Sequence, residues 1–286
     1  TTADLRYVSR VCAVSVMLSR PVMQNLEHSP IRKILNEAPG PVRLYGPGPN
    51  LPNLLGVSSV PEYLGIGPAE YYDPQLRAPK LEDSVVTAEF LKWARGSGIT
   101  HILSFDALRF GEGLPSHIDP AFSGYLRLVH EDGDRFLNPV WARPVDQPLF
   151  LYRVISTSGR ASFPDWPRGQ YGPTIEFKEY SANTVALHVY SPEPEPLTLV
   201  LTDLQYPGWS ATLDGKPVES STARGQFRSV QIPNGHHDVR WTFRPTWLLT
   251  GAVISGGCLL LLCWPLFRWP LFRWRQAIGG GEASDR

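Results

Sequence analysis

The chain has 286 residues, which is longer than one average domain and predicts two folded units. Its 27 basic and 27 acidic residues balance, so no net field recruits nucleic acid, and that class of partner is excluded. The 28 prolines, 25 glycines, 9 tryptophans and 11 tyrosines favour many short strands joined by tight turns over an all-helical fold. The three cysteines have neither the number nor the spacing of a disulfide framework or a metal site.

The first residues resemble a targeting segment. Arg6 and Arg10 precede an apolar run at 11–18, as in a signal peptide, but no Met and no small-residue cleavage site accompany them. We therefore expect residues 1–29 to lead out of a membrane helix that precedes Thr1 in a longer protein.

Residues 30–158 mix strand and helix patterns. A helix is predicted after Thr87, the expected N-cap, with Phe90, Leu91 and Ala94 on one face and Gly96 near its end. Strand, helix, strand is typical of a small α/β unit. The predicted strands are 42–45, 99–103, 125–129 and 149–154.

A long region rich in Pro and Gly, 46–79, separates the first strand from the helix. Loops of this length are uncommon inside compact domains unless packing or a ligand holds them. Its Tyr63 and Tyr72 are therefore candidate ligand contacts, with core packing as the alternative.

Residues 159–245 show all-β patterns. Two turn dipeptides, Asp214-Gly215 and Asn234-Gly235, separate the later strands. The segment 238–244 alternates strictly, with Val239 and Trp241 on one face and charged residues on the other, which indicates one buried and one solvated face. The other predicted strands are 184–190, 197–204, 210–213 and 227–232, and together they predict a small antiparallel β-sandwich.

An uncharged apolar run follows at 246–267 and is long enough, at about 1.5 Å per residue, to cross a bilayer core of about 30 Å. A buried soluble helix is the alternative. Gly251 and Ser255 form a small-xxx-small pair that suits contact with another helix. Indole and arginine side chains after the run are typical of a membrane interface. These interface candidates are Trp264, Trp269, Trp274, Arg268, Arg273 and Arg275.

The arginines predict a cytoplasmic tail at 268–286, which places residues 20–245 on the extracytoplasmic side of the membrane. The expected fold class is thus α+β: a small α/β unit (30–158), an antiparallel β-sandwich (159–245) and a C-terminal transmembrane helix (246–267).

Catalytic patterns are absent from the sequence: it contains no nucleophile elbow, phosphate loop, HExxH or CxxC. We therefore expect no catalytic residue, metal or cofactor. The aromatic pair Tyr206 and Trp209 around Pro207-Gly208 could stack on a sugar ring. The alternative is that Trp209 caps the sandwich core.

The segments LTDLQYPGWSATLDGKPV and FRSVQIPNGHHDVRWTFRP, followed by the apolar run, resemble the C-terminal end of YfhO-like bacterial membrane proteins over about 197–256. Upstream, NLPNLLGV at 50–57 and the GITHIL segment resemble the same family more loosely. The resemblance implies a polytopic protein of the bacterial cytoplasmic membrane with a fold like the GT-C glycosyltransferases.

The expected role is an accessory module that helps to position a polyprenyl-phosphate-sugar donor or a glycan acceptor. Its expected partners are the lipid bilayer and upstream membrane helices of the same protein. A membrane-tethered carbohydrate-binding module and a structural module without a ligand are the alternatives.

Overall fold

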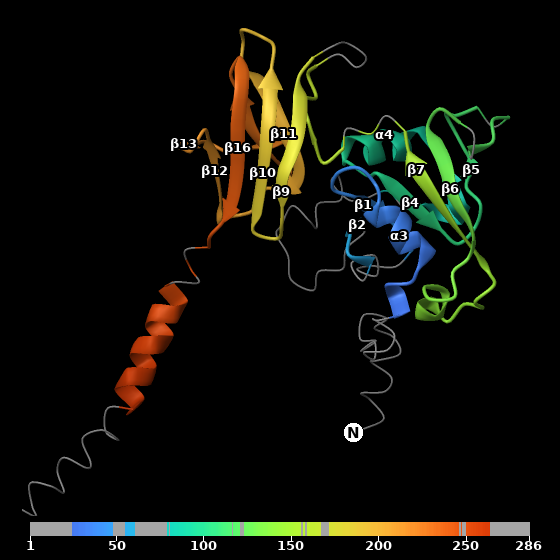
Figure 1. Cartoon of the computed structure of the whole chain (residues 1–286), viewed down its shortest axis with the longest axis horizontal. Helices are drawn as coiled ribbons and strands as arrows, with labels where there is room; N and C mark the ends of the chain where they lie inside the picture. The colour runs from blue at the N-terminus through green and yellow to red at the C-terminus, as the bar shows by residue number, and fades with distance from the viewer. Residues whose placement is uncertain are drawn as a thin grey trace, which may run out of the picture.

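The computed structural model describes residues 25–47, 55–60, 79, 81–115, 117–120, 123–155, 157, 159–166, 172–245, 247 and 250–263. Its elements form two groups that lie side by side (Figure 1). The first group contains α3 (Pro30–Asn36), β1 (Arg43–Tyr45), β2 (Ser58–Val60), η3 (Glu82–Ser84), β3 (Val85–Val86), α4 (Ala88–Gly96), β4 (His101–Ser104), β5 (Arg109–Phe110), β6 (Leu126–Gly133), η5 (Asn138–Trp141) and β7 (Pro148–Val154). The second contains β8 (Ala161–Ser162), β9 (Thr174–Tyr180), β10 (Thr184–Ser191), β11 (Leu197–Leu204), β12 (Trp209–Leu213), β13 (Lys216–Val218), β14 (Ser221–Ala223), β15 (Phe227–Ile232) and β16 (Gly235–Phe243).

The first group is built on a five-stranded sheet of order β2-β1-β4-β7-β6, here called the α/β sheet. Neighbouring residues of each strand alternate between its two faces. Ile102 of β4 packs with Phe90 of α4, whereas the adjacent Leu103 packs with Ile31 and Leu35 of α3. The two helices therefore cover opposite faces, and a separate parallel pair, β3-β5, completes the group.

Helix α4 forms as its sequence predicts. Thr87 is the N-cap, and its hydroxyl accepts a hydrogen bond from the Phe90 amide at 3.1 Å. Helix α3 was not predicted, although its sequence carries a start signal: Ser29 caps it and Pro30 occupies the first turn.

The second group is a β-sandwich, as predicted. A five-stranded sheet, β13-β12-β16-β10-β9, packs on a four-stranded sheet, β14-β15-β11-β8, and every pairing within the two is antiparallel. Val239 and Trp241 of β16 are buried in the shared core, while Asp238 and Arg240 are exposed. The alternation expected for β16 is thus confirmed, although the strand begins earlier, at Gly235.

Several contacts join the α/β sheet to the sandwich. Arg224, in the turn between β14 and β15, donates to the carbonyl of Gly96 at the end of α4 at 2.7 Å. Gly98 has φ +70°, and a Cβ added there would lie 2.4 Å from the carbonyl oxygen of Gly159 and 2.6 Å from the Thr202 hydroxyl. The two groups therefore approach each other closely where α4 ends.

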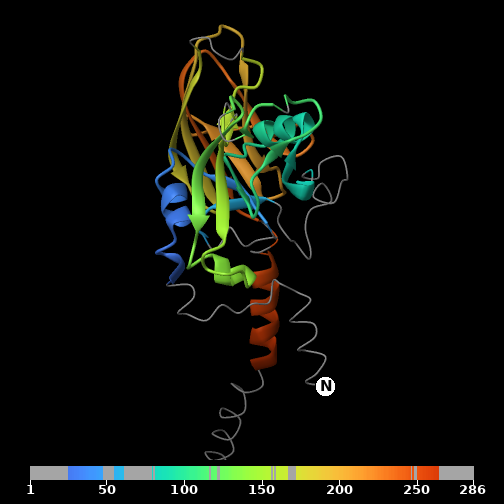
Figure 2. The same cartoon turned by 90° about the vertical axis from the view of Figure 1, so that its right-hand side faces the viewer.

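A further helix follows the sandwich and points away from it in both views (Figures 1 and 2). Its described part covers residues 250–263, about 21 Å at 1.5 Å per residue. Among the described residues no helix is long and apolar enough to cross a membrane. The transmembrane helix predicted at 246–267 is therefore not confirmed, because the run on either side of 250–263 lies largely outside the described residues.

Candidate functional site

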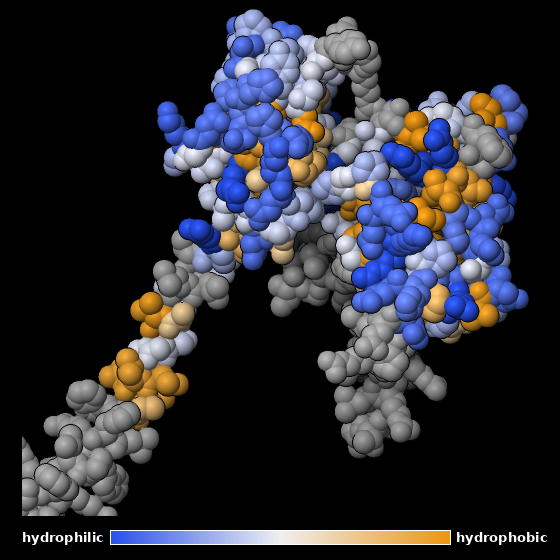
Figure 3. All heavy atoms as spheres, in the orientation of Figure 1, coloured by the Kyte–Doolittle hydropathy of each residue, from blue (hydrophilic) through white to orange (hydrophobic). Residues whose placement is uncertain are grey.

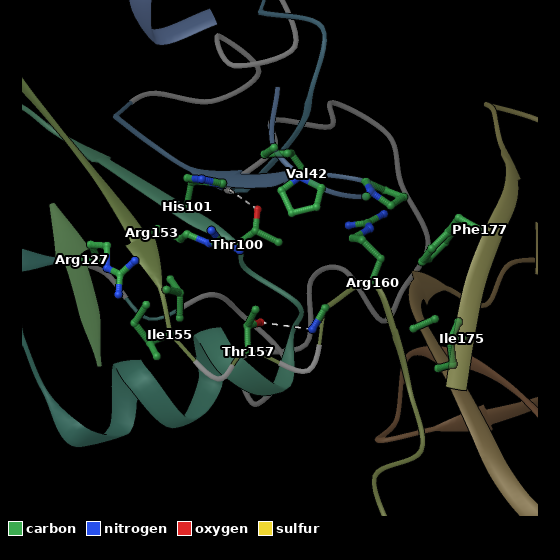
Figure 4. A pocket seen from close by; sticks show the side chains of 17 residues that line it. Val42, Thr100, His101, Arg127, Arg153, Ile155, Thr157, Arg160, Ile175 and Phe177 are labelled. Carbon is green, nitrogen blue, oxygen red and sulfur yellow. Dashed lines mark hydrogen bonds between the residues drawn. The ribbon is translucent and has the colours of Figure 1, made fainter. Parts of the chain in front are cut away.

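A pocket of about 530 Å³ lies at the junction of the α/β sheet and the sandwich. We call it the junction pocket. In Figure 4 the α/β sheet contributes His101, Arg127 and Arg153 on one side, β9 contributes Ile175 and Phe177 on the other, and Arg160 lies between them. The lining is completed by residues 38–42, 154–155 and 159–161 with Thr100 and Thr157.

The register of three strands sets basic side chains in one row on the α/β sheet. Arg153 of β7 lies directly opposite His101 of β4 and, on its other side, opposite Arg127 of β6. Directly opposite residues of antiparallel strands share a face, and like charges placed so destabilise the sheet. Arg127 and Arg153 are exposed, and within the described part of the chain no carboxylate forms an ion pair with either.

His101 is the buried member of this row, with 3% of its surface exposed. Its Nδ1 lies 3.0 Å from the hydroxyl of Thr100. Burial, followed by the charge of Arg153, lowers the pKa of His101 from 6.5 to about 4. The imidazole is therefore neutral at pH 7, and the positive charge of the row resides on the two arginines.

Arg160 connects the pocket to a buried ionic group, the Asp203 cluster, formed by Asp203, Arg43, Arg160, Arg228 and Tyr180. One Asp203 oxygen accepts from Arg160 and, at 3.2 Å, from Arg43, and the other pairs with Arg228 at 3.3 Å. The Tyr180 hydroxyl lies 3.3 Å from both oxygens. Burial lowers the pKa of Arg228 and Asp203 opposes this, yet one carboxylate still faces three guanidiniums.

The Tyr206–Trp209 turn lies at the end of the sandwich from which the last helix departs (Figure 1). Trp209 is half-buried against the sandwich core; the guanidinium of Arg228 lies 3.7 Å from the centre of its ring, and Phe243 lies 5.3 Å away. Tyr206 is 36% exposed and stands 6.3 Å, edge to face, from Trp247. These contacts favour core packing for Trp209. Contact of Tyr206 with a sugar ring stays a prediction.

The other predicted contacts do not meet at this site within the structure described. The loop tyrosines and the membrane-interface candidates lie outside the described residues; these are Tyr63, Tyr72, Trp264, Trp269, Trp274, Arg268, Arg273 and Arg275. Sequence reasoning named no residue of the junction pocket as a ligand contact. A signal was present only in part, since Arg127 and Arg153 each stand in a predicted strand, but their adjacency depends on strand order.

These observations describe a mainly β protein of two groups, with a basic pocket between them and an apolar helix after the sandwich. Residues 175–255, which run from β9 into that helix, match the family model described as bacterial membrane protein YfhO. The match confirms the resemblance seen in the sequence: over this segment the chain is similar to a family of bacterial membrane proteins. No curated protein and no solved structure matches the chain.

Proposed function

We propose that the chain is an extracytoplasmic accessory module of a polytopic membrane protein of GT-C type. In this proposal the last helix holds the sandwich against the outer face of the cytoplasmic membrane. The junction pocket then helps to position a polyprenyl-phosphate-sugar donor or a glycan acceptor for transfer. The similarity of residues 175–255 to a family of bacterial membrane proteins supports the location.

The observation that carries the proposal is the exposed apolar surface of the last helix. Leu259, Leu260, Leu261 and Leu262 are 65–76% exposed, and Figure 3 shows apolar side chains gathered along this helix. Water-exposed apolar surface of this kind marks contact with lipid or with another protein. Apolar residues on successive positions, rather than on one stripe, favour lipid or a bundle of membrane helices.

The base of this helix supports the same orientation. Tyr206 and Trp247, 36% and 50% exposed, stand against each other where β16 ends and the helix begins. Tyrosine and tryptophan favour the headgroup region because their rings are apolar while their polar atoms stay hydrated. The proposal therefore places this end of the sandwich at the membrane surface.

Protease accessibility in intact cells tests the orientation. A cleavage site in the Asn234-Gly235 turn should be cut by protease added to spheroplasts, whereas a tag after Arg286 should be protected until the membrane is broken. When residues 1–286 are expressed alone, Leu260→Lys should release them from alkali-washed membranes, since a lysine at mid-helix costs about 2.5–3.5 kcal/mol, while Leu260→Val should not. Cleavage of the tag in intact spheroplasts would reverse the orientation.

Photolabelling tests the role. Membranes containing the protein are treated with a photoactivatable polyprenyl-phosphate sugar, and the labelled peptides are mapped. Labels should concentrate in segments that line the junction pocket, such as 38–42, 153–155 and 159–161. Labelling confined to the last helix would contradict positioning by this pocket and leave the tethered structural module as the better account.

A further inference from the structure

The charges around the junction pocket indicate the chemistry of its ligand. Of the 17 residues that line it, three are arginines, one is histidine, and none of these described residues is Asp or Glu. A lining of one sign focuses its field into the cavity and concentrates ions of the opposite sign. The chain as a whole has no net charge, so this excess is local.

Arg160 is buried and only partly satisfied. Its residue is 3% exposed, and its Nη2 is engaged by Asp203 and Tyr180. Its Nε and Nη1 are buried and have no hydrogen-bond partner among the described residues. Buried donors without a partner are costly, and a charged guanidinium donor bonds most strongly to an anionic oxygen such as that of a phosphate or a carboxylate.

Arg127 and Arg153 present the second half of the site. They lie directly opposite each other on β6 and β7. Each arginine therefore faces another positive charge across the strand pair, where a carboxylate would have neutralised it. Such a pair of like charges is unfavourable by itself. An anion bound between the two guanidiniums would attract both of them and offset their mutual repulsion. The row and Arg160 face one cavity from the two groups of the fold (Figure 4).

The wall opposite the basic row is apolar and is formed by Ile175 and Phe177 of β9 (Figure 4). At about 530 Å³ the cavity has the size of an ordinary small-molecule site, larger than one inorganic anion needs. A ligand that fills it therefore combines an anionic group with a sugar-sized or apolar body.

We propose that the junction pocket binds the oxyanion, phosphate or carboxylate, of such a ligand through Arg127, Arg153 and Arg160. This inference rests on the proposed function in one respect, namely that the pocket is a ligand site, and it specifies the charged group that the site recognises. A phosphorylated sugar and a sugar acid are the two sources of that group.

Calorimetric titration of the full chain in detergent tests the inference with glucose 1-phosphate, glucuronate and neutral glucose. Both anions should bind, the dianionic phosphate more tightly, and glucose should not bind measurably. Arg153→Gln and Arg127→Gln should each weaken anion binding roughly 10- to 100-fold, the range for one lost charged hydrogen bond. Thermal melts should show both variants folded, because each removes a like-charge pair.

Arg240→Gln is the matched control. Arg240 is also an exposed strand arginine, but it pairs with Glu179 at 3.1 Å and lies outside the pocket, so anion binding should stay unchanged. Wild-type affinity in both pocket variants would overturn the inference. If glucose binds as tightly as glucose 1-phosphate, the oxyanion assignment is overturned, although the pocket can still be a glycan site of the proposed module. The protease test of orientation decides the location of the module independently.

Discussion

Replacing Asp203 by Asn removes the carboxylate that three guanidiniums share while keeping the shape of the side chain. Arg160 and Arg228 have side chains only 2% and 4% exposed, so water solvates the two guanidiniums poorly once the carboxylate charge is lost. Arg43 reaches Asp203 from β1 of the α/β sheet, so the change also weakens the junction. Removing one partner of a buried ion pair costs about 3–5 kcal/mol, and we expect Asp203→Asn to destabilise the protein by that amount.

Urea unfolding of the full chain, followed by tryptophan fluorescence, measures the effect. With a denaturant slope of about 2–3 kcal/mol per M, the loss lowers the unfolding midpoint by about 1–2.5 M. Glu179→Gln is the control: this carboxylate also pairs with an arginine, Arg240, but both side chains are 44–53% exposed. An exposed pair contributes about 0–1 kcal/mol, so the control midpoint should move by less than about 0.5 M.

Equal midpoints for Asp203→Asn and the control would refute the reasoning, because Asp203 would then not be compensating buried charge. A second variant sharpens the test. Adding Arg160→Gln to Asp203→Asn removes one uncompensated charge, so the double variant should recover part of the lost stability rather than lose more. A strictly additive loss would contradict the coupling.

Three further predictions concern other positions. The pKa of His101 is about 4 in the folded protein and 6.5 in the unfolded chain, so between these pH values the unfolded chain binds more protons. The free energy of unfolding should therefore fall by up to about 3 kcal/mol as the pH drops from 6.5 to 4. Urea midpoints measured across this range should decrease with falling pH, and His101→Gln should reduce this pH dependence. An unchanged pH dependence in the variant would contradict its origin in His101. Trp209→Ala should lower the free energy of unfolding by about 2–3 kcal/mol, less than for a fully buried indole, and Trp209→Phe should lower it less. A thermal melt measures the effect, and an unchanged midpoint for the alanine variant would favour a ligand-contact role. Gly98→Ala should lower the melting temperature, because its Cβ would collide with the Gly159 carbonyl, whereas Gly215→Ala, also at positive φ (+77°) but with nothing within 4 Å, should cost less.

Local patterns were sufficient to predict the elements whose stability is decided by near neighbours. The α4 cap needs only Thr87 and Phe90, three residues apart, and the β12–β13 turn needs only Asp214 and Gly215, both at positive φ. Strand β16 was readable because a sheet with one solvated face alternates in sequence. Short strands such as β3, β5 and β8 were missed, since two residues carry no readable period.

The sequence by itself determined the abundance of short strands, the sandwich strands β10, β11, β12, β15 and β16, helix α4 and the likeness to YfhO proteins over the matched segment. Domain boundaries and topology across the membrane stay predictions. Only the tertiary structure decided the site. Arg127 and Arg153 become neighbours because β6 pairs with β7, and Asp203 meets Arg43 across 160 positions of sequence. Such contacts depend on strand order and on the docking of two separate cores, which no local pattern of side chains encodes.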